Sequence, residues 1–113
     1  MASSLPRAAL LNRLVSALVA SRLGFLVRGG LTVVTYTGRR SGRVVSTPVG
    51  YRRRGGGVVE IPVGLPERKT WWRNFTGAGA PLSLQLDGSE RRGHAVATRD
   101  ARGRVVVTVT LAR

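Results

Sequence analysis

The spacing of hydrophobic residues changes near residues 29–30. Before this point, Leu11, Leu14 and Leu18 recur at intervals of three and four with polar residues between them, which predicts a helix over Leu5–Val27. After it, short runs rich in β-branched and aromatic residues alternate with glycine-containing turns, which predicts strands. The six predicted strands are Leu31–Tyr36, Val44–Arg52, Val58–Val63, Pro81–Leu86, Arg91–Thr98 and Arg104–Leu111.

One segment between the third and fourth predicted strands lacks strand character. Over Leu65–Phe75, Pro66 and Glu67 suit the start of a helix, and Trp71 and Phe75 lie at helical spacing. We therefore predict a short helix inserted into the run of strands.

These elements predict one domain over residues 1–113, of the mainly β (α+β) class. Residues 1–28 form an amphipathic N-terminal helix, and residues 30–113 form a barrel of about six mostly antiparallel strands. Antiparallel strands in that number close into a barrel because closure removes exposed edges. We favour a helix that covers one face of the sheet. The alternative is a basic amphipathic helix lying on an anionic membrane surface.

The charge of the chain favours an anionic partner. It has 19 Lys and Arg against 5 Asp and Glu, so a net charge of +14 attracts phosphates, nucleic acid or acidic lipid. Lys69 is the only lysine, and the planar fork of arginine grips phosphate and carboxylate. The absence of cysteine excludes disulfides and thiol catalysis, and a lone His94 argues against a metal site. No nucleophile signature is present, so any chemistry would belong to a bound cofactor.

The turn Thr37–Arg43 is the sharpest local feature. Its glycines allow backbone N–H groups to converge, Arg39, Arg40 and Arg43 add charged donors, and Ser41 adds a hydroxyl. Such a turn is suited to holding a phosphate or carboxylate. A solvated hairpin tip would have the same residue types, and the local sequence does not decide between the two.

The second feature is the pair Trp71 and Trp72, followed by Asn74. Adjacent helical residues cannot share a face, so one tryptophan is expected in the core while the other is free to stack on a planar ring. Asn74 can offer both a carbonyl and an amide to a ligand. The alternative is that both tryptophans only fix the segment to the barrel.

Three stretches together resemble the deazaflavin-dependent nitroreductase family. They are Thr35–Gly42 (TYTGRRSG), Thr47-Pro48 and Trp71–Phe75 (WWRNF). The family pattern is a Thr-Thr-Gly-Arg-Lys/Arg-Ser-Gly turn, a proline on the next strand and Trp-x-x-Asn-Leu on a later helix, in the same order. The similarity covers residues 31–86.

The resemblance implies a split β-barrel and coenzyme F420 as cofactor, with FMN as the alternative. It implies that Arg39, Arg40 and Ser41 hold the phosphate and oligoglutamate tail of F420, and that Val45–Gly50 runs beside the deazaflavin ring. The residues expected to contact the cofactor are Arg39, Arg40, Ser41, Arg43, Val45, Ser46, Thr47, Pro48, Val49, Gly50, Lys69, Trp71 and Asn74.

The implied function is an F420-dependent oxidoreductase that passes hydride to a quinone, a nitroaromatic or an activated double bond. Because the sequence ends at Arg113, we expect its acceptor pocket to lack the C-terminal segment that nitroreductases use. One alternative is a non-catalytic F420- or flavin-binding module. Another is a binder of nucleic acid or anionic membrane, although the arginines are not interleaved with the row of aromatics that single-strand binding requires. By analogy we expect a cytoplasmic homodimer, with peripheral contact at the inner face of the membrane as an option.

Overall fold

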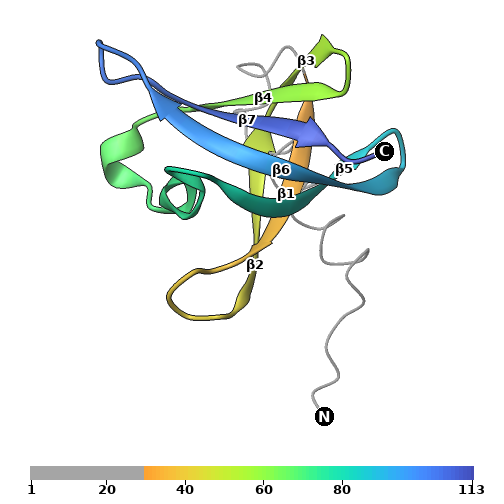
Figure 1. The fold of residues 1–113 in the computed structure, drawn as a ribbon, viewed down its shortest axis with the longest axis horizontal. Coiled ribbons are helices and arrows are strands. Elements are labelled where there is room, and N and C mark those ends of the chain that lie inside the picture. Colours follow the sequence, from red (N-terminus) through yellow and green to blue (C-terminus); the bar gives the residue numbers. More distant parts are fainter. Residues whose placement is uncertain (1–29) are drawn as a thin grey trace.

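The computed structural model describes residues 30–113, so the predicted helix over Leu5–Val27 lies outside the described residues. Within this range the chain forms seven strands and two short 3-10 turns (Figure 1). The strands are β1 (Leu31–Thr37), β2 (Val44–Gly50), β3 (Arg52–Gly55), β4 (Val58–Val63), β5 (Ala80–Leu86), β6 (Ser89–Arg99) and β7 (Val105–Leu111). The expected mainly β class is confirmed.

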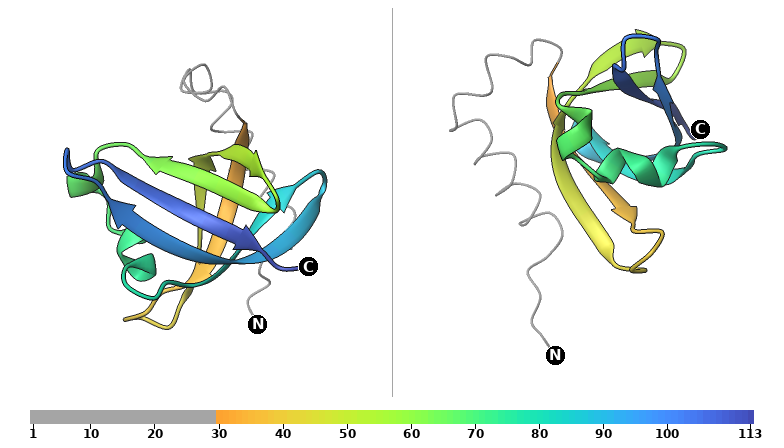
Figure 2. Two further views of the ribbon diagram at one scale, coloured as in Figure 1. Left: turned by 45° about the horizontal axis from the view of Figure 1, so that its top comes forward. Right: turned by 90° about the vertical axis from the view of Figure 1, so that its left-hand side faces the viewer.

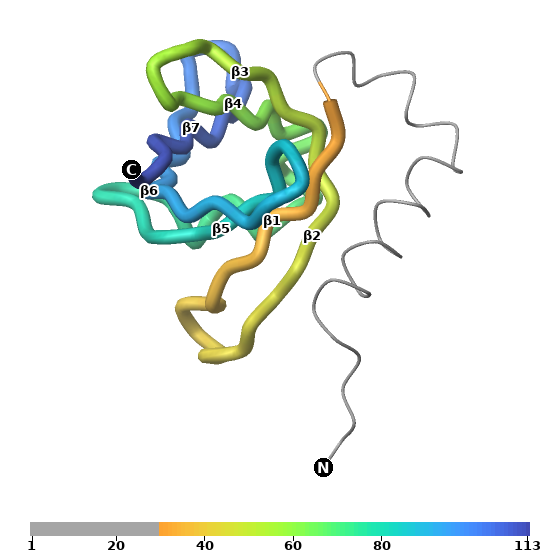
Figure 3. The backbone as a smooth tube through the Cα atoms, turned by 90° about the vertical axis from the view of Figure 1, so that its right-hand side faces the viewer, coloured from red at the N-terminus to blue at the C-terminus, as the bar shows by residue number. Residues whose placement is uncertain are grey.

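All seven strands belong to one antiparallel sheet in the order β2-β1-β5-β6-β7-β4-β3. Its two edge strands, β2 and β3, are consecutive in the chain and are separated only by Tyr51. Because consecutive Cα atoms lie about 3.8 Å apart, the two edges approach within about 8 Å at this point. The sheet therefore curls around a common interior, as Figures 2 and 3 show, and forms the expected split barrel.

The prediction of a single strand over Val44–Arg52 is wrong, which is why seven strands are found instead of about six. Tyr51 leaves the ladder, and its N–H donates to the carbonyl of Gly30 at 3.1 Å. The chain then turns from its partner β1 towards β4, so only Arg52, the last residue of the predicted strand, pairs with β4. Pro48 lies in the edge strand β2, where its missing N–H costs no central ladder bond.

The predicted inserted helix is also wrong in type. Residues 65–75 form two 3-10 turns, η2 (Pro66–Arg68) and η3 (Trp71–Phe75), separated by an extended Lys69. A 3-10 turn has three residues per turn, so residues three apart share a face. Trp72 and Phe75 are both buried in this way, at 5% and 0% exposure, and η3 closes one end of the barrel.

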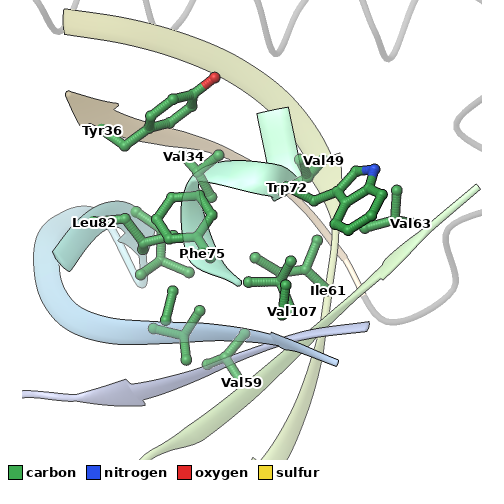
Figure 4. Packing of buried hydrophobic residues seen from close by; sticks show 14 of the residues in the cluster. Val34, Tyr36, Val49, Val59, Ile61, Val63, Trp72, Phe75, Leu82 and Val107 are labelled. Carbon is green, nitrogen blue, oxygen red and sulfur yellow. The ribbon is translucent and has the colours of Figure 1, made fainter. Parts of the chain in front are cut away.

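The barrel interior is filled by apolar side chains that alternate along the strands and by two side chains from η3 (Figure 4). Complete burial of one such large side chain stabilises the fold by about 2 to 3 kcal/mol. The core comprises Val34, Tyr36, Val49, Val59, Ile61, Val63, Trp72, Phe75, Leu82, Leu84, Leu86, Ala95, Ala97, Val105, Val107 and Val109.

A side chain completes the pairing between β1 and β5. The ladder between these strands pairs only Val34 with Leu84 and Thr35 with Ser83. Beyond it, the hydroxyl of Thr32 donates to the carbonyl of Gln85 at 2.7 Å and accepts from the N–H of the same residue at 3.1 Å. Because Thr32 is 1% exposed, one buried hydroxyl satisfies two backbone groups where the strands diverge.

We expect Thr32→Val to lower the free energy of unfolding by about 2 kcal/mol, because valine keeps the volume but leaves both backbone groups of Gln85 unpaired. Urea unfolding measures the change. Thr32→Ser is the control, since it keeps the hydroxyl and loses only a methyl group. A valine variant more stable than the serine variant would contradict the assigned role of the hydroxyl.

Candidate anion-binding site

The turn between β1 and β2 is closed by its own hydrogen bonds. The N–H of Gly38 donates to the carbonyl of Arg43 at 2.8 Å, and that of Gly42 donates to the carbonyl of Gly38 at 2.9 Å. The hydroxyl of Ser41 accepts from the N–H of Arg43 at 3.1 Å. Gly42 has φ of 71°, which glycine adopts without strain. These backbone groups shape the turn itself, whereas one of the two sequence-based interpretations had backbone N–H groups converging on a ligand.

Asn74 joins this turn to η3. Its Oδ1 accepts from the N–H of Arg39 at 2.9 Å, and its Nδ2 donates to the carbonyl of Trp71 at 2.8 Å. Trp71 and Asn74 lie three residues apart in a 3-10 turn, so they share a face. The side chain that sequence reasoning offered to a ligand therefore holds two segments of the protein together.

A cavity of about 410 Å³ lies between the turn and η3. Three arginines line it, two from the turn (Arg39 and Arg40) and one from η3 (Arg73). No carboxylate of residues 30–113, which include all five acidic residues of the chain, is among its lining residues. The lining comprises Tyr36, Gly38, Arg39, Arg40, Ser41, Val45, Thr70, Arg73 and Asn74.

Four of the five acidic residues pair with arginines outside the cavity. The ion pairs are Arg53 with Asp87, Arg54 with Glu60, Arg99 with Glu67 and Arg104 with Asp100. Within residues 30–113, Arg39, Arg40 and Arg73 form no ion pair. The cavity is thus lined by guanidinium groups without a counter-charge, which favours binding of an anion.

Two of the lining residues, Tyr36 and Val45, add apolar surface to the cavity. Tyr36 is 8% exposed, and its ring packs edge-on against Phe75 with centroids 5.4 Å apart and lies 6.5 Å from the ring of Trp71. Val45, at the start of β2, lines the same cavity. Cationic and apolar walls together suit a ligand with an anionic part and a non-polar part.

The structure brings together only part of the predicted site. Arg39, Arg40, Ser41, Val45 and Asn74 line the cavity. The remaining predicted residues do not: Arg43, Ser46, Thr47, Pro48, Val49, Gly50, Lys69 and Trp71. Two of these face inward, since Val49 belongs to the core and Trp71 packs against it. Four more belong to β2, beside which the resemblance places the deazaflavin ring: Ser46, Thr47, Pro48 and Gly50.

Four lining residues were absent from the predicted set, namely Tyr36, Gly38, Thr70 and Arg73. Tyr36 directly precedes the turn Thr37–Arg43 and Gly38 lies within it, so position in or next to the motif was an available signal. Arg73 lies between Trp72 and Asn74, but only the 3-10 geometry of η3 decides which of these side chains faces the cavity.

Two other kinds of site are not found in the part of the chain that the structure describes. Residues 30–113 contain no group of three or more His, Cys, Asp or Glu side chains placed to hold a metal ion. They also contain no helix long and apolar enough to span a membrane.

We expect Asn74→Ala to destabilise the protein by about 1 to 2 kcal/mol through the loss of two hydrogen bonds, and to free the amide of Arg39. Hydrogen exchange at that amide is the direct measurement and should accelerate. Thr76→Ala is the matched control, because Thr76 makes one bond within its own segment, to the carbonyl of Arg73 at 3.1 Å. Equal exchange at Arg39 in both variants would contradict the bridging role.

Burial raises the pKa of the Tyr36 phenol above its usual 10.0, and a hydrogen bond with the side chain of Thr47 opposes this to a smaller extent. The folded pKa is therefore above the unfolded one, so the stability provided by the neutral phenol is complete below pH 10.0 and is lost as pH rises through the folded value. We expect the unfolding free energy of Tyr36→Phe to fall less steeply above pH 10.0 than that of the wild type. The unfolding free energies are measured by denaturant titration between pH 9 and 11. If they change equally with pH in the variant and the wild type, this prediction is refuted.

Comparison with known protein families agrees with the geometry of the site. A model of the F420H(2)-dependent quinone reductase family matches residues 11–110, which is most of the chain. Comparison with curated proteins gives no match. The family match spans the barrel, the arginine-bearing turn and η3 alike. The chain therefore belongs to the F420H(2)-dependent quinone reductase family.

Proposed function

We propose that this protein binds reduced F420 in the cavity between the β1–β2 turn and η3 and reduces a quinone. The observation on which the proposal rests is the cavity with three arginines and no carboxylate among its lining residues. The family match supports the choice of F420 among anionic cofactors.

The residues of the cavity fit the anionic tail of this cofactor. That tail has a phosphate and several carboxylates, and guanidinium groups bind both with paired, charge-assisted hydrogen bonds. The hydroxyl of Ser41 accepts from the N–H of Arg43 and keeps its own proton as a further donor. We assign Arg39, Arg40 and Ser41 to the tail, with Tyr36 and Val45 as the apolar wall.

The chemistry needs little from protein side chains. A quinone takes up one hydride and one proton to become a hydroquinone, and the reduced deazaflavin supplies both. The protein then acts by holding its two ligands in contact, which lowers the barrier by fixing position and orientation. The rigid strand β2 is the element that we assign to the ring, because it leads directly from the arginine-bearing turn.

The double variant Arg39→Gln/Arg40→Gln tests the assignment of the turn. We expect F420 affinity to fall by about 100-fold, since each lost charge-assisted contact is worth roughly tenfold or more. Fluorescence titration with F420 measures affinity, and loss of reduced-F420 absorbance with menadione as acceptor measures turnover. Two controls of equal charge change are Arg91→Gln/Arg102→Gln and Arg92→Gln/Arg102→Gln, whose arginines do not line the cavity.

Each outcome has a distinct meaning. Absence of F420 binding by the wild type would refute the proposal. Tight binding without turnover of menadione or other acceptors would instead indicate a non-catalytic binding module. Equal losses in the turn variant and the controls would show that only net charge matters, and would refute the assignment of the turn.

A further inference from the structure

Arg73 has a setting that no other cavity arginine shares. It belongs to η3, whereas Arg39 and Arg40 belong to the β1–β2 turn. Its guanidinium carbon lies 4.8 Å from the centroid of the Trp72 ring. Trp72 is itself fixed, because it is 5% exposed and its indole N–H donates to the carbonyl of Pro66 at 3.0 Å. Arg73 therefore rests on a rigid aromatic surface, which restricts where its charge can be.

Contact with the Trp72 ring does not by itself distinguish Arg73 from the other arginines. A second guanidinium, that of Arg99, lies 5.3 Å from the same ring. Arg99 pairs with Glu67 at 3.9 Å and does not line the cavity, whereas Arg73 lines the cavity and has no carboxylate partner within residues 30–113. Both guanidinium groups contact the indole ring, but only that of Arg99 has a carboxylate partner. The charge of Arg73 is therefore not neutralised by an ion pair within residues 30–113, and it can interact with a ligand.

The cavity is larger than a single phosphate group. A phosphate group consists of one phosphorus and four oxygen atoms. If each atom occupied about 30 Å³, the volume of one water molecule in the liquid, the group would fill about 150 Å³. The cavity measures about 410 Å³, and its arginines come from two separate segments, the β1–β2 turn and η3. A phosphate held by the turn would therefore leave room beside Arg73 for a second anion.

We propose that Arg73 is a specificity-determining residue that binds a second anionic group, a carboxylate beyond the phosphate, and so selects deazaflavins with an extended acidic tail. This inference rests on the proposed function and deepens it. A cofactor with one phosphate and nothing beyond it would engage the turn and leave Arg73 unused. The fork of the guanidinium suits a carboxylate, with which it can form two parallel hydrogen bonds.

The test compares two ligands and two variants. The ligands are F420 with its full glutamate tail and the same deazaflavin with its tail cut back to the phosphate. The variants are Arg73→Gln and the matched control Arg99→Gln, which also removes one charge from above Trp72 but leaves the cavity lining intact. Affinity is measured by fluorescence titration, and thermal unfolding checks that both variants fold.

We expect Arg73→Gln to weaken binding of full-length F420 about tenfold and binding of the shortened ligand by less than about twofold. Arg99→Gln should change neither affinity by more than about twofold. Arg73→Lys should recover part of the loss, since it keeps the charge but not the planar fork.

Equal weakening of both ligands by Arg73→Gln would overturn the inference and leave the proposed function standing. The same would follow if Arg99→Gln matched Arg73→Gln. If the wild type bound neither ligand, the proposed function would fail, and the inference with it.

Discussion

The connection of β2 to β3 through the single residue Tyr51 is the constraint on which the barrel depends. These strands are the two edges of one seven-stranded sheet, so a link this short obliges the sheet to curl until its edges approach. Curling encloses the alternating apolar side chains and leaves one end of the barrel open. The two buried side chains of η3, Trp72 and Phe75, close that end. Closure of the core and placement of the site are thus consequences of one topology.

The site forms where two segments distant in sequence meet at that end. The turn after β1 provides Arg39 and Arg40, and η3 provides Arg73 and Asn74, with the Asn74 amide joining the two segments. Residues 30–113 contain too few carboxylates to pair every arginine, so several arginines outside the cavity also form no ion pair within this range. The site is distinguished by three arginines and no carboxylate around one cavity, which makes the local potential positive.

The cavity also relates the fold to redox chemistry without a catalytic side chain. A hydride carrier must be held in the correct orientation, and this matters more than acidic or basic side chains. The described residues provide strands with a packed core, apolar lining side chains and three arginines around one cavity. Tyr36 links these parts, since its ring belongs to the core and also lines the cavity. Arg73 adds a third arginine to the lining of the cavity, from η3.

The sequence predicted most of the strands, the turn at residues 37–43 and the separation of one buried from one partly buried tryptophan, because periodicity and turn chemistry are local properties. It indicated the family through the turn and the WWRNF segment. Tertiary contacts were needed to show that the strand after Val44 divides at Tyr51, since the break comes from pairing with a distant partner, β4. They were also needed to show that η3 is a 3-10 turn, that Asn74 bonds to the protein and that Arg73 lines the same cavity as Arg39. Each of these depends on how η3 packs its two buried rings into the barrel.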